Sequence, residues 1–496
     1  MPGQTGDGGQ FSRPGRRITL SVLTGAANTV LVAGLGALSI RLITVHVGPT
    51  NYGLFVTALT FVSSVMLLTD LGINSITGRE IARSPNDAAE ILGHNLGLRL
   101  TLSAILVPIL TFIGVALYHE PSLRWSIVLI ALAVPFDALR AISLGYYAAS
   151  IRNYVASGIS LLQQVLFVAG VAIALTSGFG IVGCATSYLV STFVSGSLAF
   201  LVVRREVLFK PLYNLKRWRQ VFALSASLGA IQAINILYLK ADTLILSRMS
   251  TPHAVGLYGV AYSFTTFILV VPSLIMVSVM PLLATSSGER FAKLVRQAVH
   301  GLVVLGTAAV IVVLLFASQA ITVLSGHHFL AAATSMRLLA LASLFSYLNA
   351  ALGWAAVACN HHHRMIFVSG IGLFLNVGLN LALIPRFGID GAATSTLISE
   401  FLALIGVRVV FGRDVGAKIS LIKISLLPVL VGIAVVLLGR YVLLRSWYAP
   451  VSTIFWAPGF LILYLGLLAL VGGLPQEVAF IWQKIKNVTH RHIPRR

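Results

Sequence analysis

The sequence predicts an all-α integral membrane protein of about 14 transmembrane helices, arranged as two parallel-repeat six-helix bundles plus two C-terminal helices. Of the 496 residues, 57% are hydrophobic and only 10% are charged, whereas a soluble protein carries about 25% charged residues. Many apolar stretches reach about 18 residues, enough to cross the ~30 Å hydrocarbon core of a bilayer. Because these stretches lack the alternating pattern of a membrane barrel, we expect them to be helices.

The predicted spans follow one another with mostly short connections. In chain order they cover residues 18–45, 53–77, 95–118, 123–147, 155–177, 180–203, 221–246, 256–281, 298–324, 331–358, 365–385, 389–411, 421–443 and 452–473. The polar start of the chain leads into a long apolar run, which indicates a first membrane helix rather than a removable signal peptide.

Two copies of one pattern divide the chain into halves. Residues 179–187 (FGIVGCATS) are matched by residues 387–395 (FGIDGAATS), and residues 52–55 (YGLF) by residues 255–258 (VGLY), at offsets of about 208 and 203 residues. Six spans separate the first pair of copies, and an even number gives both halves the same orientation. The predicted segments are a cytoplasmic N-terminal tail (1–17), an N-terminal six-helix bundle (18–203), a basic cytoplasmic linker (204–220), a C-terminal six-helix bundle (221–411), two extra transmembrane helices (420–473) and a basic cytoplasmic tail (474–496).

The net charge of +21 is explained by topology. Lysines and arginines gather in the loops that fall on one side of the predicted spans, while the opposite loops hold only Arg124, Arg248, Arg386 and Arg445. By the positive-inside rule, both termini are cytoplasmic in a multi-pass protein of the plasma (inner) membrane. A nucleic-acid partner is therefore not expected.

Ionisable residues inside spans are costly, so each is a functional candidate. They are Arg41, Asp70, Arg99, Asp137, Arg140, Lys240, Asp242, Arg337 and Glu400. Asp70 shares one predicted helix face with Ser63, Asn74 and Thr77, and Asp242 shares another with Asn235 and Tyr238.

Two interpretations of these polar faces remain open. They either line an aqueous cavity or hold helices together by hydrogen bonds. Asp137 and Arg140 lie three residues apart and can pair with each other. Glu400 is either an ion- or proton-coupling site or a partner of Arg337 or of another helix.

No motif indicates an enzyme, a metal site or a cofactor. The sequence has no phosphate-binding glycine loop, no Walker lysine motif and no convincing nucleophile triad. The run His361-His362-His363 points in different directions on a helix and has no nearby acid or thiol, which favours a solvated cytoplasmic loop over a metal site. Short outer loops also disfavour a membrane glycosyltransferase.

Several motifs resemble a known family. Residues 48–55 (GPTNYGLF), 69–73 (TDLGI) and 79–83 (REIAR), together with 242–246 (DTLIL) and 255–258 in the second half, resemble the polysaccharide transporters of the multidrug/oligosaccharidyl-lipid/polysaccharide (MOP) flippase superfamily, of the O-antigen flippase type. The resemblance extends over essentially the whole chain and carries over two motif positions, Asp70 and Asp242.

The resemblance implies a flippase that moves an undecaprenyl-pyrophosphate-linked oligosaccharide from the cytoplasmic to the outer leaflet by alternating access, for cell-surface polysaccharide biosynthesis. Its polar part would occupy a central cavity, its pyrophosphate bound by cationic and hydrogen-bonding groups. Candidates for that role are Arg41, Arg99, Arg140, Lys240, Arg337, Asn28 and Asn235. The coupling or cavity acids would be Asp70, Asp137, Asp242 and Glu400, with H⁺ or Na⁺ as the coupling ion.

Expected partners are the lipid-linked substrate, the bilayer and other polysaccharide-assembly membrane proteins. Alternatives in the same superfamily are a multidrug and toxin extrusion antiporter and a flippase for the peptidoglycan precursor.

Overall fold

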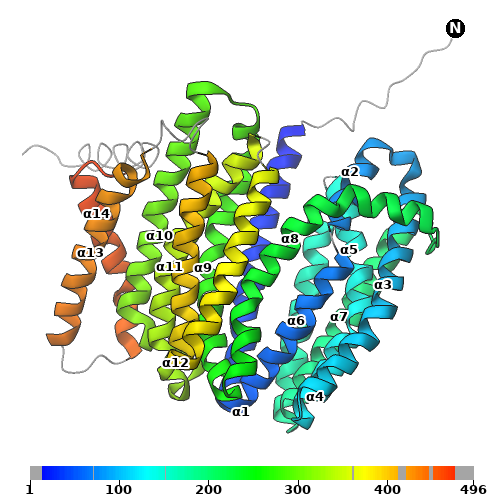
Figure 1. Ribbon diagram of the computed structural model, residues 1–496, viewed down its shortest axis with the longest axis horizontal. Helices are drawn as coiled ribbons and strands as arrows, with labels where there is room; N and C mark the ends of the chain where they lie inside the picture. The colour runs from blue at the N-terminus through cyan, green and yellow to red at the C-terminus, as the bar shows by residue number, and fades with distance from the viewer. Residues whose placement is uncertain are drawn as a thin grey trace, which may run out of the picture. The chain divides into compact units, whose positions relative to one another are not determined.

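A computed structural model describes residues 14–70, 72–150, 152–359, 362–411, 420–445 and 451–474 of the protein (Figure 1). Within these ranges all regular structure is helical, without a strand. The helices are long and apolar, so the chain is an all-α membrane protein, and the predicted fold class is confirmed.

The chain forms two compact units. Unit 1 comprises Met1–Val47 and Leu54–Ile236, and unit 2 comprises Gly48–Gly53 and Leu237–Arg496. Unit 1 contains most of α1 (Pro14–Asp70), then α2 (Ile73–Arg83), α3 (Ala88–Leu117), α4 (Pro121–Leu132), α5 (Val134–Ala149), α6 (Asn153–Thr176), α7 (Gly180–Glu206) and the first part of α8 (Leu215–Met249). Unit 2 contains the rest of α8, then α9 (Pro252–Ala284), α10 (Gly288–Ser325), η2 (His327–Ala332), α11 (Ala333–Ala358), α12 (His362–Phe411), α13 (Leu421–Arg445), η4 (Val451–Trp456) and α14 (Ala457–Leu470).

Two of these helices each contain two predicted spans. In α1 the backbone leaves helical geometry at Gly48 (φ 72°), directly before Pro49, and in α12 it does so at Gly388 (φ 55°). Both φ values lie in the region that favours glycine, so each glycine marks the turn between two membrane-length helices. The described residues contain 11 helices long and apolar enough to span a membrane. Counting α1 and α12 as two helices each, divided at these glycines, and adding α8, which is not among the 11, gives the predicted 14 spans.

The second predicted span is interrupted, which the sequence analysis did not anticipate. We expected one helix over residues 53–77, but α1 ends at Asp70 and α2 begins at Ile73, with Gly72 in the left-handed region (φ 80°) between them. The helical wheel that placed Asp70 on one face with Asn74 and Thr77 therefore does not apply. The fourth predicted span lies within one candidate membrane span, Pro121–Ala149. Only Ala133 separates α4 from α5, and its backbone keeps helical dihedral angles (φ −76°, ψ −18°).

The linker between the halves is shorter than predicted and lies on unit 1. Only residues 207–214 separate α7 from α8. The Leu212 amide donates to the carbonyl oxygen of Gly93 at 2.9 Å. A Cβ atom at Gly97 would lie 2.2 Å from the Leu212 carbonyl oxygen. These two glycines allow the linker backbone to rest directly on α3.

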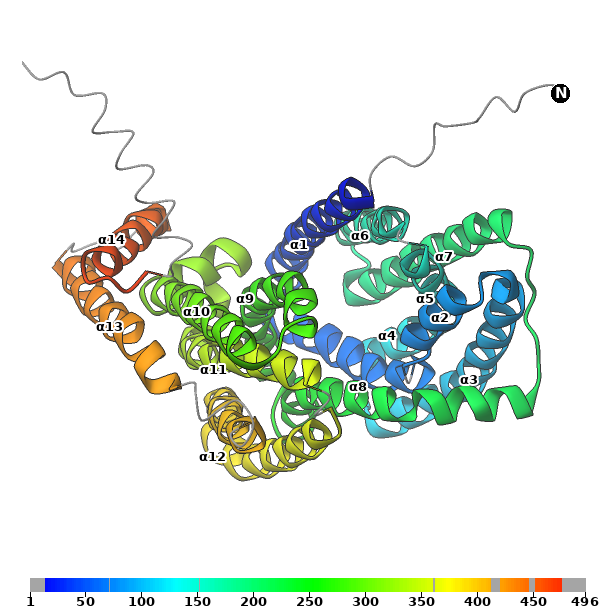
Figure 2. The ribbon, with the colours of Figure 1, turned by 90° about the horizontal axis from the view of Figure 1, so that it is seen from above.

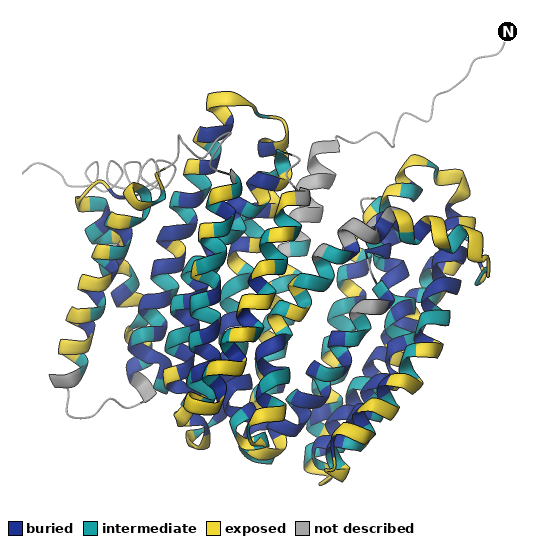
Figure 3. Ribbon diagram, in the orientation of Figure 1, coloured by how far each residue is buried: buried dark blue, intermediate teal, exposed yellow. Residues whose placement is uncertain are grey.

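Each unit has its own apolar core. In unit 1, Leu92 and Leu96 of α3 pack with Tyr147 of α5. In unit 2, α10 and α11 are mostly buried, whereas α12 and α13 carry many exposed residues (Figure 3). The last two helices, α13 and α14, pack on α10 (Figure 2) through a cluster that includes Phe316 and Tyr464.

The repeated YGLF and VGLY segments meet inside unit 2. A Cβ atom at Gly53 would lie 1.8 Å from the carbonyl oxygen of Pro252, and one at Gly256 would lie 2.0 Å from the carbonyl oxygen of Pro49. No side chain fits at such distances, so both positions require glycine. Beside this contact, Tyr52 packs edge-on against Phe329 of η2 with ring centroids 6.0 Å apart. Residues 48–53 of the N-terminal half thereby belong to the packing of unit 2.

Candidate functional site

Four of the ionisable residues in the predicted spans of unit 1 form two ion pairs. Arg99 of α3 pairs through its guanidinium with the carboxylate of Asp70, at the end of α1. The side chain of Arg99 is 2% exposed and that of Asp70 is 30% exposed. Asp70 also accepts a hydrogen bond at 3.4 Å from the Asn74 backbone amide, which belongs to the first turn of α2. The break at Gly72 therefore brings an acid to the start of a helix, where negative charge is favoured.

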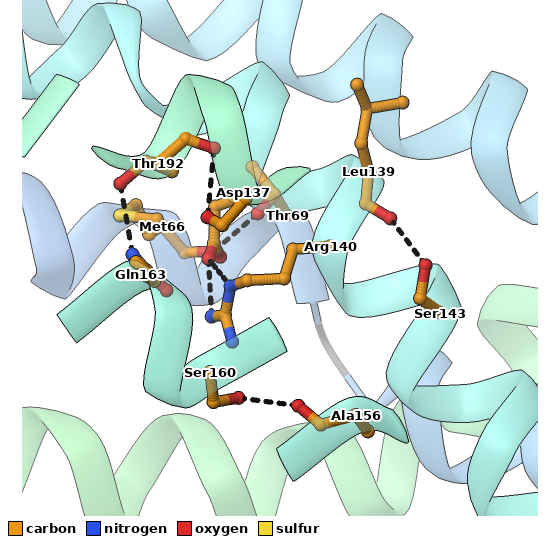
Figure 4. Close-up of polar contacts among 11 residues, drawn as sticks. Met66, Thr69, Asp137, Leu139, Arg140, Ser143, Ala156, Ser160, Gln163 and Thr192 are labelled. Carbon is orange, nitrogen blue, oxygen red and sulfur yellow. Dashed lines mark hydrogen bonds and ion pairs between the residues drawn. The ribbon is translucent and has the colours of Figure 1, made fainter. Parts of the chain in front are cut away.

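The second pair joins Asp137 and Arg140 on α5, as their spacing predicts. Nη2 and Nε of Arg140 donate to one Asp137 oxygen at 2.6 and 3.0 Å. Figure 4 shows the guanidinium directed at the carboxylate, with Thr69 of α1, Gln163 of α6 and Thr192 of α7 nearby. Gln163 donates to the Thr192 hydroxyl at 3.1 Å.

The four charges of these two ion pairs balance one another. Arg99 lies within electrostatic range of Asp137 and Arg140 as well as Asp70, so two cations face two anions. The side chains of Asp137 and Arg140 are 24% and 21% exposed, so this pair is open to a ligand to a degree that Arg99 is not.

Asp242 of α8 is the centre of a different arrangement in unit 2. Its side chain is 2% exposed. The carboxylate accepts hydrogen bonds from the Tyr258 hydroxyl at 2.8 Å, the Thr396 hydroxyl at 2.5 Å and the Asn380 amide at 2.6 Å. In the described residues no lysine, arginine or histidine forms an ion pair with it. Three donors can satisfy an ionised carboxylate, and a buried carboxylate in that state favours a nearby counter-charge.

Oxygen atoms around Asp242 could contribute to cation binding. Oδ1 of Asn380 is buried and has no hydrogen-bond partner in the described part of the chain. Oδ1 of Asn376 accepts from Asn380 at 3.1 Å, and the Thr396 hydroxyl lies against the carboxylate. One carboxylate with amide and hydroxyl oxygens suits a hard monovalent cation, since divalent sites usually need more charge. The described residues hold no group of three or more His, Cys, Asp or Glu that could bind a metal ion.

Glu400 of α12 forms a neighbouring acidic site. It accepts hydrogen bonds from the Tyr238 hydroxyl at 3.2 Å and from the Asn349 amide at 2.8 Å. Arg337 instead donates to Ser318 of α10. The alternative in which Glu400 pairs with Arg337 is therefore wrong. Glu400 and Asp242 lie within electrostatic range of each other, and their like charges add to the negative potential of this region.

The remaining predicted residues are distributed along the helices. Asn28 is half-buried and Arg41 is exposed, both on α1. Asn235 is exposed, and Lys240 is half-buried and forms no ion pair with a described residue. Of the histidine run, His361 and the side chains of His362 and His363 lie outside the described residues.

Sequence reasoning missed the partners of Asp242. Asn376 and Asn380 lie four residues apart, a spacing that places both on one helix face. They sit on the first part of α12, and Thr396 lies just beyond the repeated segment at 387–395. The signal was present, but only the fold shows that these residues meet α8.

The fold and these polar clusters define a polytopic all-α membrane protein whose described residues form two compact units. The chain belongs to the polysaccharide biosynthesis protein family, whose profile matches residues 21–287. It is 24% identical, over 394 residues, to the capsular polysaccharide biosynthesis protein CapF of Staphylococcus aureus, covering 76% of this chain and 94% of that protein.

Solved structures share the fold. The lipid II flippase MurJ in an inward closed conformation superposes with a TM-score of 0.76 at 14% identity, over 91% of this chain and 98% of that one. An inward-facing multidrug resistance MATE family transporter of the MOP superfamily gives a TM-score of 0.64 at 15% identity, over 84% of this chain and 96% of that one. At these identities the likeness concerns the fold alone.

Proposed function

We propose that this protein is a flippase that moves a polyprenyl-diphosphate-linked oligosaccharide from the cytoplasmic to the outer leaflet of the plasma membrane by alternating access, and performs no chemical step. The observation that carries the proposal is that a chain of the polysaccharide biosynthesis protein family has the fold of a MOP transporter. The distribution of basic loops supports cytoplasmic termini.

The charges of unit 1 suit the diphosphate of such a substrate. Arg140 is partly exposed, and among the described residues its hydrogen bonds go to Asp137 of its own helix. A phosphate oxygen can therefore replace Asp137 as its partner. Arginine binds phosphate and carboxylate with the same bidentate geometry, which makes the exchange close to neutral in hydrogen bonds. Asp137 and Asp70 hold the arginines in place when no substrate is bound.

Asp242 with its partners Tyr258, Asn380 and Thr396 forms what we call the Asp242 cluster. We propose that this cluster binds the coupling ion and that the ion is Na⁺. Thermal unfolding of the full-length protein in detergent, measured in NaCl, KCl and choline chloride at equal ionic strength, tests this. Specific stabilisation by Na⁺ that disappears in Asp242→Asn is the expected result. Stability that depends on pH and not on Na⁺ would instead indicate H⁺.

The substrate is tested in a strain that lacks the protein. Its lipids are extracted and the polyprenyl-linked glycans are identified by mass spectrometry. Accumulation of one glycan, reversed by the wild-type gene, is expected. The likeness to MurJ favours one second candidate, a flippase for the peptidoglycan precursor, and accumulation of lipid II would identify it. If neither lipid accumulates and the strain becomes sensitive to cationic drugs, the flippase proposal is wrong.

A further inference from the structure

At one end of unit 2, three helices bring two arginines together. Near the start of α11, Arg337 donates from Nη2 to the Ser318 hydroxyl of α10 at 3.4 Å. On α13, Arg440 follows Gly439, whose Cβ position lies 2.7 Å from the Leu315 side chain of α10. Leu315 and Ser318 are three residues apart in the last turns of α10, so α13 and α11 contact the same short stretch of that helix. Arg440 is exposed and directly follows Gly439 on α13, so both arginines come from helices that contact this stretch of α10.

Neither of these two positive charges has an acidic partner among the described residues. They lie within electrostatic range of each other. The Nε atom of Arg337 is buried and has no hydrogen-bond partner among the described residues. A buried donor left without an acceptor, beside a second cation, is costly unless an anion occupies the site.

The helix that both α11 and α13 contact, α10, is kinked near this site. In α10, Phe316 leaves helical geometry (φ −120°, ψ 15°) two residues before Ser318. A kink of this kind re-aims the last turns of a helix. The next residue, Gln319, donates to Thr453 of η4 at 3.5 Å. The polar end of α10 is thereby held between α11 and the segment that leads into α14.

We propose that Arg337 and Arg440 bind the phosphate group of a membrane lipid at the end of unit 2 where α10, α11 and α13 meet. A phosphate has several acceptor oxygens and its negative charge can satisfy two guanidinium groups at once. Arg337 lies near the first residue of α11 and Arg440 near the last residue of α13, positions from which long basic side chains can reach lipid headgroups. The predicted topology assigns this end to the outer leaflet, opposite the basic loops.

The shared chemistry is a lipid-borne phosphate, which has two sources. One is the headgroup of an anionic phospholipid, and the other is the diphosphate of a polyprenyl-linked cargo after translocation. The first source is independent of the proposed function, and the second rests on it. Arg440 lies on α13, outside the two six-helix repeats, so the site is separate from the Asp242 cluster.

Native mass spectrometry of the full-length protein in detergent tests this proposal. The probes are phosphatidylglycerol, undecaprenyl diphosphate and diacylglycerol, the last lacking phosphate. We expect one of the two phosphate lipids to bind in preference to diacylglycerol. Arg337→Gln and Arg440→Gln should each weaken that binding by about tenfold, the effect of losing one charge-assisted interaction. Arg337→Lys should retain part of the affinity, because it keeps the charge but not the planar fork.

Arg386→Gln is the matched control. Arg386 is exposed on α12, at the same end of the unit, where Asp390 accepts a hydrogen bond from Ser335 of α11 at 2.6 Å. This variant should bind as the wild type does. The proposal is wrong if neither phosphate lipid binds preferentially, or if Arg386→Gln weakens binding as much as the other two. Selective binding of undecaprenyl diphosphate supports the cargo as source, and selective binding of phosphatidylglycerol supports the headgroup. Glycan accumulation in the deletion strain is measured separately, so failure of this site leaves the flippase proposal standing.

Discussion

Removing the charge of Asp70 should destabilise unit 1 far more than removing that of Asp137. Asp70→Asn leaves Arg99 charged, 2% exposed and without its ionic partner. Breaking a buried pair costs about 3–5 kcal/mol, and we take the lower end because the Asp70 side chain is 30% exposed. At 2–4 °C per kcal/mol, a loss of about 3 kcal/mol lowers the melting temperature by roughly 6–12 °C.

The comparison variants separate the ion pair from other effects. Arg99→Gln should lower the free energy of unfolding by less, about 1–2 kcal/mol. In this variant the Asp70 carboxylate remains partly hydrated and still accepts a hydrogen bond from the Asn74 amide. The double variant should be less destabilised than the sum of the two, with a coupling energy of about 1–3 kcal/mol. Asp137→Asn removes a partly exposed pair within one helix and should cost at most about 1 kcal/mol.

Thermal unfolding of the full-length protein in detergent, followed by tryptophan fluorescence, is the assay. Additive effects of Asp70→Asn and Arg99→Gln would refute the interpretation that their interaction holds α1 and α3 together. A small effect of Asp70→Asn, combined with loss of glycan transport in the complementation assay, would instead assign Asp70 to substrate or ion binding.

Three further predictions concern unit 2 and the cysteines. If Na⁺ occupies the Asp242 cluster, a concentration of 100 times its Kd should stabilise the wild type by about 2.7 kcal/mol, and Asp242→Asn should show no such gain in melts with NaCl against KCl. Gly53→Ala forces a Cβ to within 1.8 Å of a carbonyl oxygen, so it should lower the melting temperature or the yield of folded protein. Gly301→Ala, with nothing within 4 Å of its Cβ, should be neutral or slightly stabilising. Cys184 is buried and Cys359 half-buried, so a water-soluble maleimide should label Cys359 first in the folded protein, as peptide mass spectrometry would show; equal rates would contradict this packing.

Hydropathy was sufficient to predict the fold class because few backbone structures are stable in a lipid bilayer. A long apolar stretch in a bilayer must be a helix, and the glycines at positions 48 and 388 mark turns between spans that the pattern had already separated. The break at Gly72 was not predictable in the same way. A single glycine in an apolar run is tolerated in a helix. The hydrogen bond from the Asn74 amide to Asp70 forms only once the backbone has turned.

In the candidate site, contacts within one helix were predictable from the sequence, whereas contacts between helices were not. The pair Asp137 and Arg140 is local, so its spacing predicts it. Arg99 and Asp70 were both identified as candidates, yet their pairing depends on how α1 and α3 pack, and no sequence spacing encodes that. Asp242 was likewise identified, while its partner Asn380 lies on a helix far along the chain. Burial cost identifies which residues need a partner, and tertiary packing decides which partner they obtain.

The glycine contact between the repeated segments has a consequence for biosynthesis. Residues 48–53 pack with Pro252 and Gly256 in unit 2, and those residues leave the ribosome long after the first six spans. Until then Tyr52 lacks its neighbour Phe329, and the backbone turn at Gly48 has nothing to rest on. The N-terminal half therefore enters the bilayer incomplete, and the second half supplies the surface on which it finishes folding. If the protein were cut between the halves, the N-terminal fragment would need the C-terminal fragment in the same membrane to complete the packing of residues 48–53.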